Sequence, residues 1–145
     1  MEIEVASVRR LYRFLLETLP FHTFRIYVHI LTEPFISLLA ELPVSVKKYS
    51  EVFLDGEKRR VNDYAVKRLV SAGYSGVWYV NRLHAKMLII GSRPSYIVIG
   101  SSNLTARSFE NYEVIVIIRN PSAEVVDRAL RIAHHAETRK YRPEL

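Results

Sequence analysis

Short apolar runs rich in β-branched and aromatic residues alternate along the chain with stretches whose apolar residues recur at helical spacing. The runs predict buried strands, and the stretches between them predict amphipathic helices. An order of helix, strand, helix, strand, helix, several strands and a last helix is typical of an α/β layered domain. The sequence therefore predicts a mixed sheet flanked by helices on both faces. Because no repeat or linker interrupts the pattern, residues 1–145 are expected to form a single domain.

The expected elements have definite limits in the sequence. Helical spacing and flanking Pro or Gly residues predict four helices. The first spans Val5 to Leu19 and ends near Pro20, and the second begins with Thr32 and Pro34 and is stopped by Pro43. The third spans Val61 to Ala72 with Gly73 after it, and the last follows Asn120-Pro121. Apolar runs predict strands over Phe24 to Leu31, Val44 to Leu54, Gly76 to Tyr79, Leu83 to Ile90, Tyr96 to Ile99 and Tyr112 to Ile118. Asp55-Gly56 is expected to form a turn.

Composition and charge narrow the class of protein. With 49% hydrophobic and 25% charged residues, the chain is an ordinary globular sequence, which excludes disordered and fibrous classes. A formal net charge of +6 favours polyanionic partners, nucleic acid first and anionic lipid second. No apolar run reaches the roughly 18 residues of a membrane span, and the first ten residues lack the apolar segment of a signal peptide. A membrane association is therefore not expected, and a cytoplasmic location is.

Two residue types are missing from the chain. Cysteine is absent, which excludes disulfides and thiolate metal sites. Glutamine is absent as well, and the loss of both types resembles the depletion of heat-labile residues in hyperthermophilic proteins. A thermophilic protein is one interpretation of this composition, and chance in a short sequence is the other.

Polar side chains stand at one end of three expected strands. His84 and Lys86 begin one strand, and their spacing of two predicts that both side chains leave the same face. Ser101 and Asn103 follow the end of the next strand, and Glu113 stands near the start of a third. Small and polar residues at the end of a buried strand allow a phosphate oxygen to approach backbone amides and hydroxyls. We therefore interpret these residues as a candidate phosphate site.

The pattern His-x-Lys, an apolar strand, Gly-Ser-x-Asn and then Asn-x-Glu before another apolar strand resembles the active-site array of the phospholipase D superfamily. It is most similar to the small single-motif bacterial endonucleases and to the nuclease domains of metal-independent restriction enzymes. The matching stretch runs from Leu83 to Ile118, and the order of the preceding elements fits the half-domain of that family. The sequence departs from the family motif H-x-K-x4-D at one position, where Gly91 replaces the aspartate.

The resemblance implies a metal-independent phosphodiesterase with no cofactor. His84 would form a covalent phosphohistidine, and a second histidine would protonate the leaving group. Because the chain has only one such motif, two copies are expected to meet in a homodimer with a shared site. Lys86 and Asn103 would bind phosphate oxygens with help from Ser101, and Glu113 would orient the imidazole and set its tautomer.

Three functions remain open from the sequence. The first is a nuclease that cleaves DNA or RNA, the second a phospholipid phosphodiesterase or phosphatidyltransferase, and the third a catalytically weak nucleic-acid-binding module. The basic run from Lys58 to Arg60 is compatible with a nucleic-acid backbone and equally with an ordinary solvated surface. His134 and His135 are adjacent on an expected helix and therefore point to different faces, which favours a solvated face over a metal site.

Overall fold

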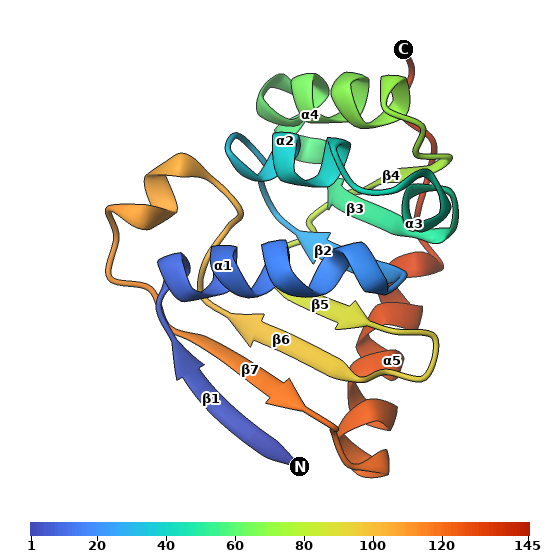
Figure 1. Ribbon diagram of the computed structural model, residues 1–145. Helices are drawn as coiled ribbons and strands as arrows, with labels where there is room; N and C mark the ends of the chain where they lie inside the picture. The colour runs from blue at the N-terminus through green and yellow to red at the C-terminus, as the bar shows by residue number, and fades with distance from the viewer.

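A seven-stranded mixed sheet runs through the computed structural model, which describes residues 1–145 (Figure 1). The strands are β1 (Glu2–Ala6), β2 (Phe24–Val28), β3 (Glu51–Asp55), β4 (Gly76–Val80), β5 (Met87–Ile90), β6 (Tyr96–Gly100) and β7 (Ile115–Arg119). The helices are α1 (Val8–Thr18), α2 (Phe35–Ala40), α3 (Val44–Tyr49), α4 (Arg59–Ser71) and α5 (Ala123–Glu137). Short 3₁₀ turns follow α1, precede α4 and lie between β6 and β7 (Leu19–Phe21, Gly56–Lys58 and Ala106–Phe109).

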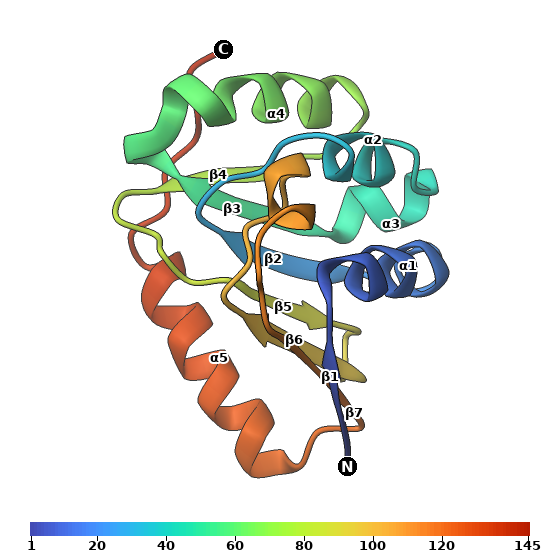
Figure 2. The same ribbon diagram turned by 90° about the vertical axis from the view of Figure 1, so that its left-hand side faces the viewer.

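The strands are ordered β1-β7-β6-β5-β2-β3-β4 across the sheet. The strands β2, β3 and β4 are parallel to one another, whereas β5, β6, β7 and β1 each run antiparallel to the preceding neighbour. The helices α1 to α4 cover one face of the sheet and α5 covers the other (Figure 2). The predicted α/β fold with helices on both faces is confirmed.

Successive side chains of the central strands belong alternately to two separate hydrophobic cores. In β2, Ile26 and Val28 belong to the larger core, which also contains Leu11 of α1 and Leu69 of α4. Tyr27, between them, points to the smaller core beneath α5. Because successive side chains of a strand point to opposite faces, an apolar run with no alternation predicts a strand covered on both sides. Each large side chain buried in this way contributes about 1.5–3 kcal/mol relative to an exposed position.

The start of the chain forms an edge strand rather than the first turn of a helix. Val5 lies in β1, which pairs antiparallel with β7, so the prediction that the first helix includes Val5 is wrong. The helix begins after Ser7, whose side chain accepts a hydrogen bond from the backbone N–H of Arg10 at 3.2 Å. The Glu4 carboxylate binds the guanidinium groups of Arg10 and Arg119, and these hydrogen bonds, the one to Arg10 most of all, lower the pKa of Glu4. The two ion pairs connect β1 to α1 and to β7.

The predicted strand Val44 to Leu54 is also wrong in its first half. Residues after Pro43 form the helix α3, and the strand is limited to β3. Pro43 supplies a fixed φ before the first helical residue, Val46 is buried, and the Lys47 ammonium donates to the carbonyl of Ala40 at 3.0 Å. These contacts favour a short helix where β-branched residues alone favour a strand.

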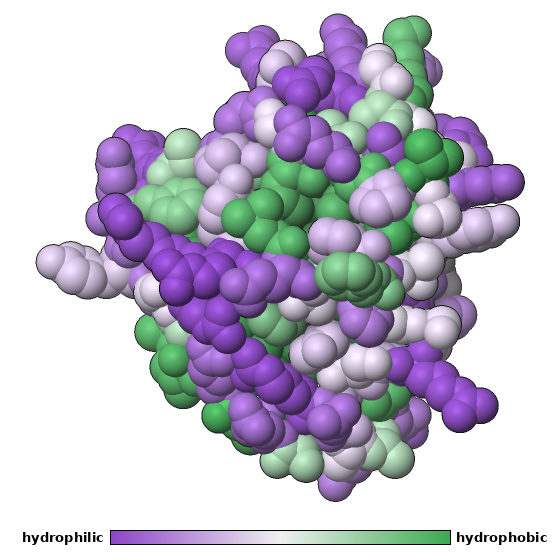
Figure 3. Space-filling view, viewed as in Figure 1, coloured by the Kyte–Doolittle hydropathy of each residue, from purple (hydrophilic) through white to green (hydrophobic).

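The predicted helices of the second half of the chain are close to the observed ones. The helix α4 ends before Gly73, and α5 follows Asn120-Pro121 with Ser122 as its cap, accepting from the Val125 backbone N–H at 3.3 Å. No helix of the structure has both the length and the apolar character that a membrane crossing requires. On the face of the molecule that α1 and α4 cover, hydrophilic side chains form a broad band beside smaller apolar areas (Figure 3).

Candidate active site

One end of the sheet collects the loops that carry the candidate residues. The carboxyl ends of the parallel strands β2 and β3 lie at this end. Because β5 is antiparallel to β2, its amino end lies beside them, and the same alternation brings the carboxyl end of β6 and the amino end of β7 to this edge. The expected gathering of the His-x-Lys, Gly-Ser-x-Asn and Asn-x-Glu segments therefore follows from strand direction.

His84 and Lys86 lie in the loop before β5 and not on the strand. The strand begins only at Met87, so the prediction of a strand from Leu83 is wrong at its start. Arg82 has a φ of 62°, a left-handed conformation that a strand does not contain. His84 is exposed, and the Lys86 ammonium donates to the backbone carbonyl of His84 at 3.1 Å. The Lys86 side chain is thus held beside His84 by a contact to the loop backbone rather than by strand alternation.

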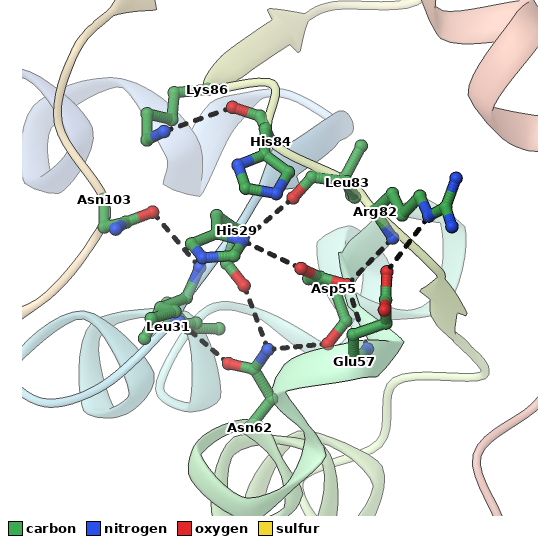
Figure 4. A network of polar contacts seen from close by, with 11 residues as sticks. His29, Leu31, Asp55, Glu57, Asn62, Arg82, Leu83, His84, Lys86 and Asn103 are labelled. Atoms are coloured by element: carbon green, nitrogen blue, oxygen red, sulfur yellow. Dashed lines mark hydrogen bonds and ion pairs between the residues drawn. The ribbon is translucent and has the colours of Figure 1, made fainter.

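The imidazole of His84 lies flat on the imidazole of His29 (Figure 4). The ring centroids are 4.4 Å apart and the ring planes differ by 23°. His29 directly follows β2 and Asp55 ends β3, and the His29 Nδ1 lies 2.9 Å from Asp55 Oδ2 and 3.1 Å from the carbonyl of Leu83. Asp55 is buried, and its Oδ1 accepts from the backbone N–H of Arg82 at 3.1 Å. The His29 ring beneath His84 is therefore held at its Nδ1 by two acceptors.

Asn62 of α4 connects the strand ends from below. It is fully buried, and its Nδ2 donates to the carbonyls of His29 and Asp55 at 3.0 and 3.1 Å. Its Oδ1 accepts from the backbone N–H of Leu31 at 3.1 Å. A buried polar side chain that satisfies three backbone groups fixes the relative position of the segments it joins. Asn62 thus holds the ends of β2 and β3, and with them His29 and Asp55.

The other side of the candidate site is formed by the loops after β6 and before β7, which carry Ser101, Asn103 and Glu113. The Asn103 Oδ1 accepts from the backbone N–H of Ile30 at 3.2 Å, which leaves its amide NH₂ group without a partner inside the chain. Ser101 Oγ donates to Glu113 Oε2 at 2.7 Å. Gly100 permits the close approach of the two loops, since a Cβ there would lie 2.5 Å from the carbonyl oxygen of Val114.

Glu113 does not contact His84 within one chain. Its carboxylate is bound to Ser101, and it lies in the loop before β7, so the predicted strand Tyr112 to Ile118 is wrong at its start. The backbone N–H of Val114 donates to Ser101 Oγ at 3.1 Å instead of joining the sheet. The orienting effect of Glu113 on His84 stays a prediction, and the contact that the structure shows is the one to Ser101.

A cavity of about 430 Å³ is lined in part by Ser101, Asn103 and Glu113. It is lined mainly by polar groups: Ile30, Thr32, Val61, Ser101, Asn103, Thr105, Arg107, Ser108, Asn111 and Glu113. His84 and Lys86 stand outside the lining.

Gly91, which replaces the motif aspartate, lies at the far end of β5 from His84. Its φ is 100°, and a Cβ at this position would come within 3.0 Å of the Arg93 carbonyl oxygen and 3.1 Å of the Ser95 backbone nitrogen. An aspartate would be strained in this turn, and a side chain at this end of the strand does not reach the candidate site. The departure from the motif thus leaves the groups around His84 unchanged.

Sequence reasoning missed three residues of the site: His29, Asp55 and Asn62. A signal was present for two of them, because His29 is the polar residue inside an apolar run and Asp55 is a carboxylate at the end of a buried strand. Polar groups at the carboxyl ends of adjacent parallel strands often gather in one cleft. Asn62 gave no such signal, since a single polar residue on a helix is ordinary. His134 and His135 are exposed on α5, as the sequence indicated.

Comparison with protein families gives a match over residues 28–136 to the family described as cardiolipin synthase, PLD-like domain. A search of curated proteins gives no match. Among solved structures, the chain is similar to Nuc from Salmonella typhimurium, a phospholipase D family member, with a TM-score of 0.77 and 18% identity over 98% of this chain and 99% of the other. It is also similar to NucT from Helicobacter pylori, with a TM-score of 0.78 and 15% identity over 96% and 97% of the two chains.

A third similar structure is TrmBL2, an archaeal chromatin protein described as having a novel mode of DNA binding. The TM-score is 0.65 at 12% identity, and the alignment covers 99% of this chain and 54% of the other. At these identities the solved structures show a common fold, while the family match rests on the sequence itself. The fold expected from the His-x-Lys array is confirmed.

Proposed function

The chain belongs to the phospholipase D-like family, and on that premise we propose that it is a metal-independent phosphodiesterase, specifically a nuclease that cleaves DNA or RNA. The observation that carries this proposal is the exposed His84 imidazole, which lies in the same loop as Lys86 and near the loop of Asn103, whose amide NH₂ group is unpaired (Figure 4). These groups supply a nucleophile and donors for the charged phosphate oxygens without a cluster of carboxylates to hold catalytic metal ions.

His84 is the nucleophile of the proposed reaction. Neither of its ring nitrogens has a hydrogen bond within the chain, so a lone pair is free to attack phosphorus. Attack forms an N–P bond and breaks the bond from phosphorus to the leaving oxygen, which takes up a proton from a general acid. Water then cleaves the N–P bond and restores the imidazole. Lys86 and Asn103 stabilise the charge that develops on the phosphate oxygens in both steps.

The general acid comes from a second copy of the chain. In-line displacement requires the acid on the side of phosphorus opposite the nucleophile. His29 does not meet this requirement, because its ring is stacked on His84 at 4.4 Å and leaves no space for a phosphate between the two rings. A homodimer with a twofold axis between the sites would place His84 of the partner subunit opposite His84. In this shared site one His84 would act as nucleophile and the other as general acid.

Nucleic acid is the proposed substrate class. The net charge of +6 favours a polyanion, and the similar structures include a DNA-binding chromatin protein. The polar cavity beside Asn103, with Arg107 in its lining, offers hydrogen-bond donors for sugar and phosphate groups. A lipid substrate would require apolar surface for acyl chains, and eight of the ten cavity-lining residues are polar.

A nucleic-acid-binding module with little activity is the second candidate. It is favoured by the likeness to TrmBL2, an archaeal chromatin protein described as having a novel mode of DNA binding. This alternative predicts that the chain binds DNA or RNA without cleaving it. A cleavage assay therefore distinguishes it from the proposed nuclease.

The test uses the purified chain with EDTA on plasmid DNA, single-stranded DNA, RNA and phosphatidylcholine vesicles, beside the His84→Ala variant. We expect cleavage of at least one nucleic acid in EDTA, no release of lipid headgroup, and no cleavage by His84→Ala. Binding without cleavage would favour the second candidate. An activity that disappears with EDTA and returns with Mg²⁺ would contradict the mechanism, because the charge would then be neutralised by metal ions.

A further inference from the structure

We propose that His29, Asp55 and His84 form a binding site for a divalent transition metal ion, with Zn²⁺ as the best chemical fit, and that the occupied site is inactive. One donor atom from each side chain lies within 4.8 Å of the others. The loss of activity rests on the proposed function, because it requires His84 to be the nucleophile. The binding of the ion does not depend on that function.

The donor set favours a transition metal over Mg²⁺ or Ca²⁺. Two imidazoles and one carboxylate are a common set of three protein ligands for Zn²⁺, with the fourth position of the tetrahedron left for water or another ligand. Imidazole suits Zn²⁺, Cu²⁺ and Ni²⁺, whereas Mg²⁺ and Ca²⁺ prefer sites made of oxygen atoms. The His84 side of the cluster is exposed, so an ion can enter from solvent.

Two of the three ligands are already within about 0.4 Å of the spacing that a metal requires. Donor atoms bound to one tetrahedral Zn²⁺ at about 2.0–2.1 Å are roughly 3.3 Å apart. His29 Nδ1 and Asp55 Oδ2 are 2.9 Å apart, so that the Nδ1 proton lies between them. An ion that replaces this proton would keep both side chains close to their present positions, and it would release one proton to solvent.

The third ligand is the one that can move. His84 must bring a ring nitrogen toward the other two donors from a separation of up to 4.8 Å. Its side chain is exposed and neither ring nitrogen is hydrogen-bonded in the chain, so a tilt of the ring costs only the stacking on His29. The site is therefore two-thirds formed before the ion binds and is completed by a small rotation of an exposed side chain.

The surrounding groups support this geometry. The side chains of His29 and Asp55 are only 12% and 2% exposed. Asp55 Oδ1 accepts from the backbone N–H groups of Glu57 and Arg82 at 2.9 and 3.1 Å, which leaves Oδ2 directed at His29. Hydrogen bonds to the ligands of a metal fix their orientation and raise its affinity. The buried pair thus requires little ordering when the ion arrives.

An ion in this site would use the lone pair with which His84 attacks phosphorus. Zn²⁺ would therefore inhibit cleavage, and a chelator would restore it. This response is the reverse of that of a two-metal nuclease, in which a chelator abolishes activity.

The experiment measures Zn²⁺ binding to the full chain by calorimetry, with the visible spectrum of bound Co²⁺ as a second readout of tetrahedral coordination. We expect one ion per chain. His84→Ala and His29→Phe should each weaken binding by at least about tenfold, since each removes one nitrogen ligand. His29→Phe keeps a flat ring under His84. The matched control is the double variant His134→Ala with His135→Ala, which removes two exposed histidines from α5 and should bind Zn²⁺ as the wild type does.

Unchanged affinity in His84→Ala, or loss of binding in the α5 double variant alone, would overturn the proposal. One ion per two chains with no effect of His29→Phe would also overturn it, because the ion would then lie between two His84 residues. His84→Ala removes an exposed side chain and keeps the test valid if His29→Phe fails to fold. Zn²⁺ binding in a chain without phosphodiesterase activity would refute the proposed function and leave the site, whereas activity in a chain that binds no Zn²⁺ would refute the site alone.

Discussion

His84 rests face to face on His29, with 4.4 Å between the ring centroids, although His29 follows one strand and His84 precedes another. The ring of His29 is anchored by Asp55 and by the carbonyl of Leu83. One face of His84 is therefore covered by a fixed ring, while its edge and its ring nitrogens remain accessible. This arrangement gives the proposed nucleophile a defined orientation in a loop that would otherwise provide none.

His84→Ala should abolish turnover, a loss of at least about a thousandfold in kcat, while nucleic-acid affinity stays within about twofold. The reason is that no phosphohistidine can form, whereas the donors to the phosphate remain.

Lys86→Ala should weaken binding and rate together, because its charge acts in the ground state and in the transition state. Single-turnover kinetics and filter binding separate the two effects. Lys48→Ala, at an exposed position of α3, is the control. Equal losses of affinity in His84→Ala and Lys86→Ala would contradict these roles.

Asn103→Asp should keep the fold and lose activity. The new carboxylate can still accept from the backbone N–H of Ile30, as the Asn103 Oδ1 does, but it replaces the NH₂ donor by a negative oxygen that repels phosphate. We expect kcat/KM to fall by at least about a hundredfold. Asn111→Asp adds the same charge to the same cavity without touching the proposed phosphate position, and it should reduce kcat/KM only severalfold. Similar losses in both variants would mean that Asn103 acts through general charge alone.

Mixed dimers test the shared site. If each reaction needs two His84 residues, dimers of one wild-type and one His84→Ala chain are inactive, and activity falls as the square of the wild-type fraction. The measurement is cleavage rate against mixing ratio, with subunit exchange followed by two labels. A linear decrease with complete exchange would show that each chain carries its own complete site. A monomer by light scattering at micromolar concentration would exclude the dimer directly.

Vanadate and tungstate should inhibit the enzyme in the presence of EDTA. These oxyanions resemble the phosphate group and would occupy the space between His84, Lys86 and Asn103. We expect competitive inhibition against nucleic acid, and a weaker effect on Lys86→Ala because one donor is missing. Inhibition that is identical in wild type and Lys86→Ala would place the oxyanion elsewhere.

Asn62→Ala should lower the free energy of unfolding by about 2–4 kcal/mol, since it leaves three buried backbone groups without their hydrogen-bond partner. Urea denaturation measures the change. Lys67→Ala, at an exposed position of the same helix, should change stability by less than about 0.5 kcal/mol. Because Asn62 binds the carbonyls of His29 and Asp55, any activity that Asn62→Ala retains should also be reduced. A loss of stability no larger than that of the Lys67 control would show that water replaces the amide.

Much of the fold was predictable because its information is local. Apolar runs identified β2, β5 and β6, and helical spacing identified α1, α4 and α5. The errors have two causes, which are a contact distant in sequence and a local contact that composition does not reveal. Val5 has the spacing of a helix and becomes part of a strand because β1 pairs with β7, more than a hundred residues later. Residues after Pro43 have the composition of a strand and form the helix α3.

The sequence alone determined the candidate site residues His84, Lys86, Ser101, Asn103 and Glu113, because their types and spacing are those of a known array. Only the tertiary structure decided what surrounds them. Strand order and direction bring the ends of β2 and β3 beside the loop before β5, and this places His29 and Asp55 against His84. Periodicity reports which face of an element is apolar, whereas the pairing of strands depends on interactions over the whole chain. For that reason the histidine stack and its buried carboxylate could be found only in three dimensions.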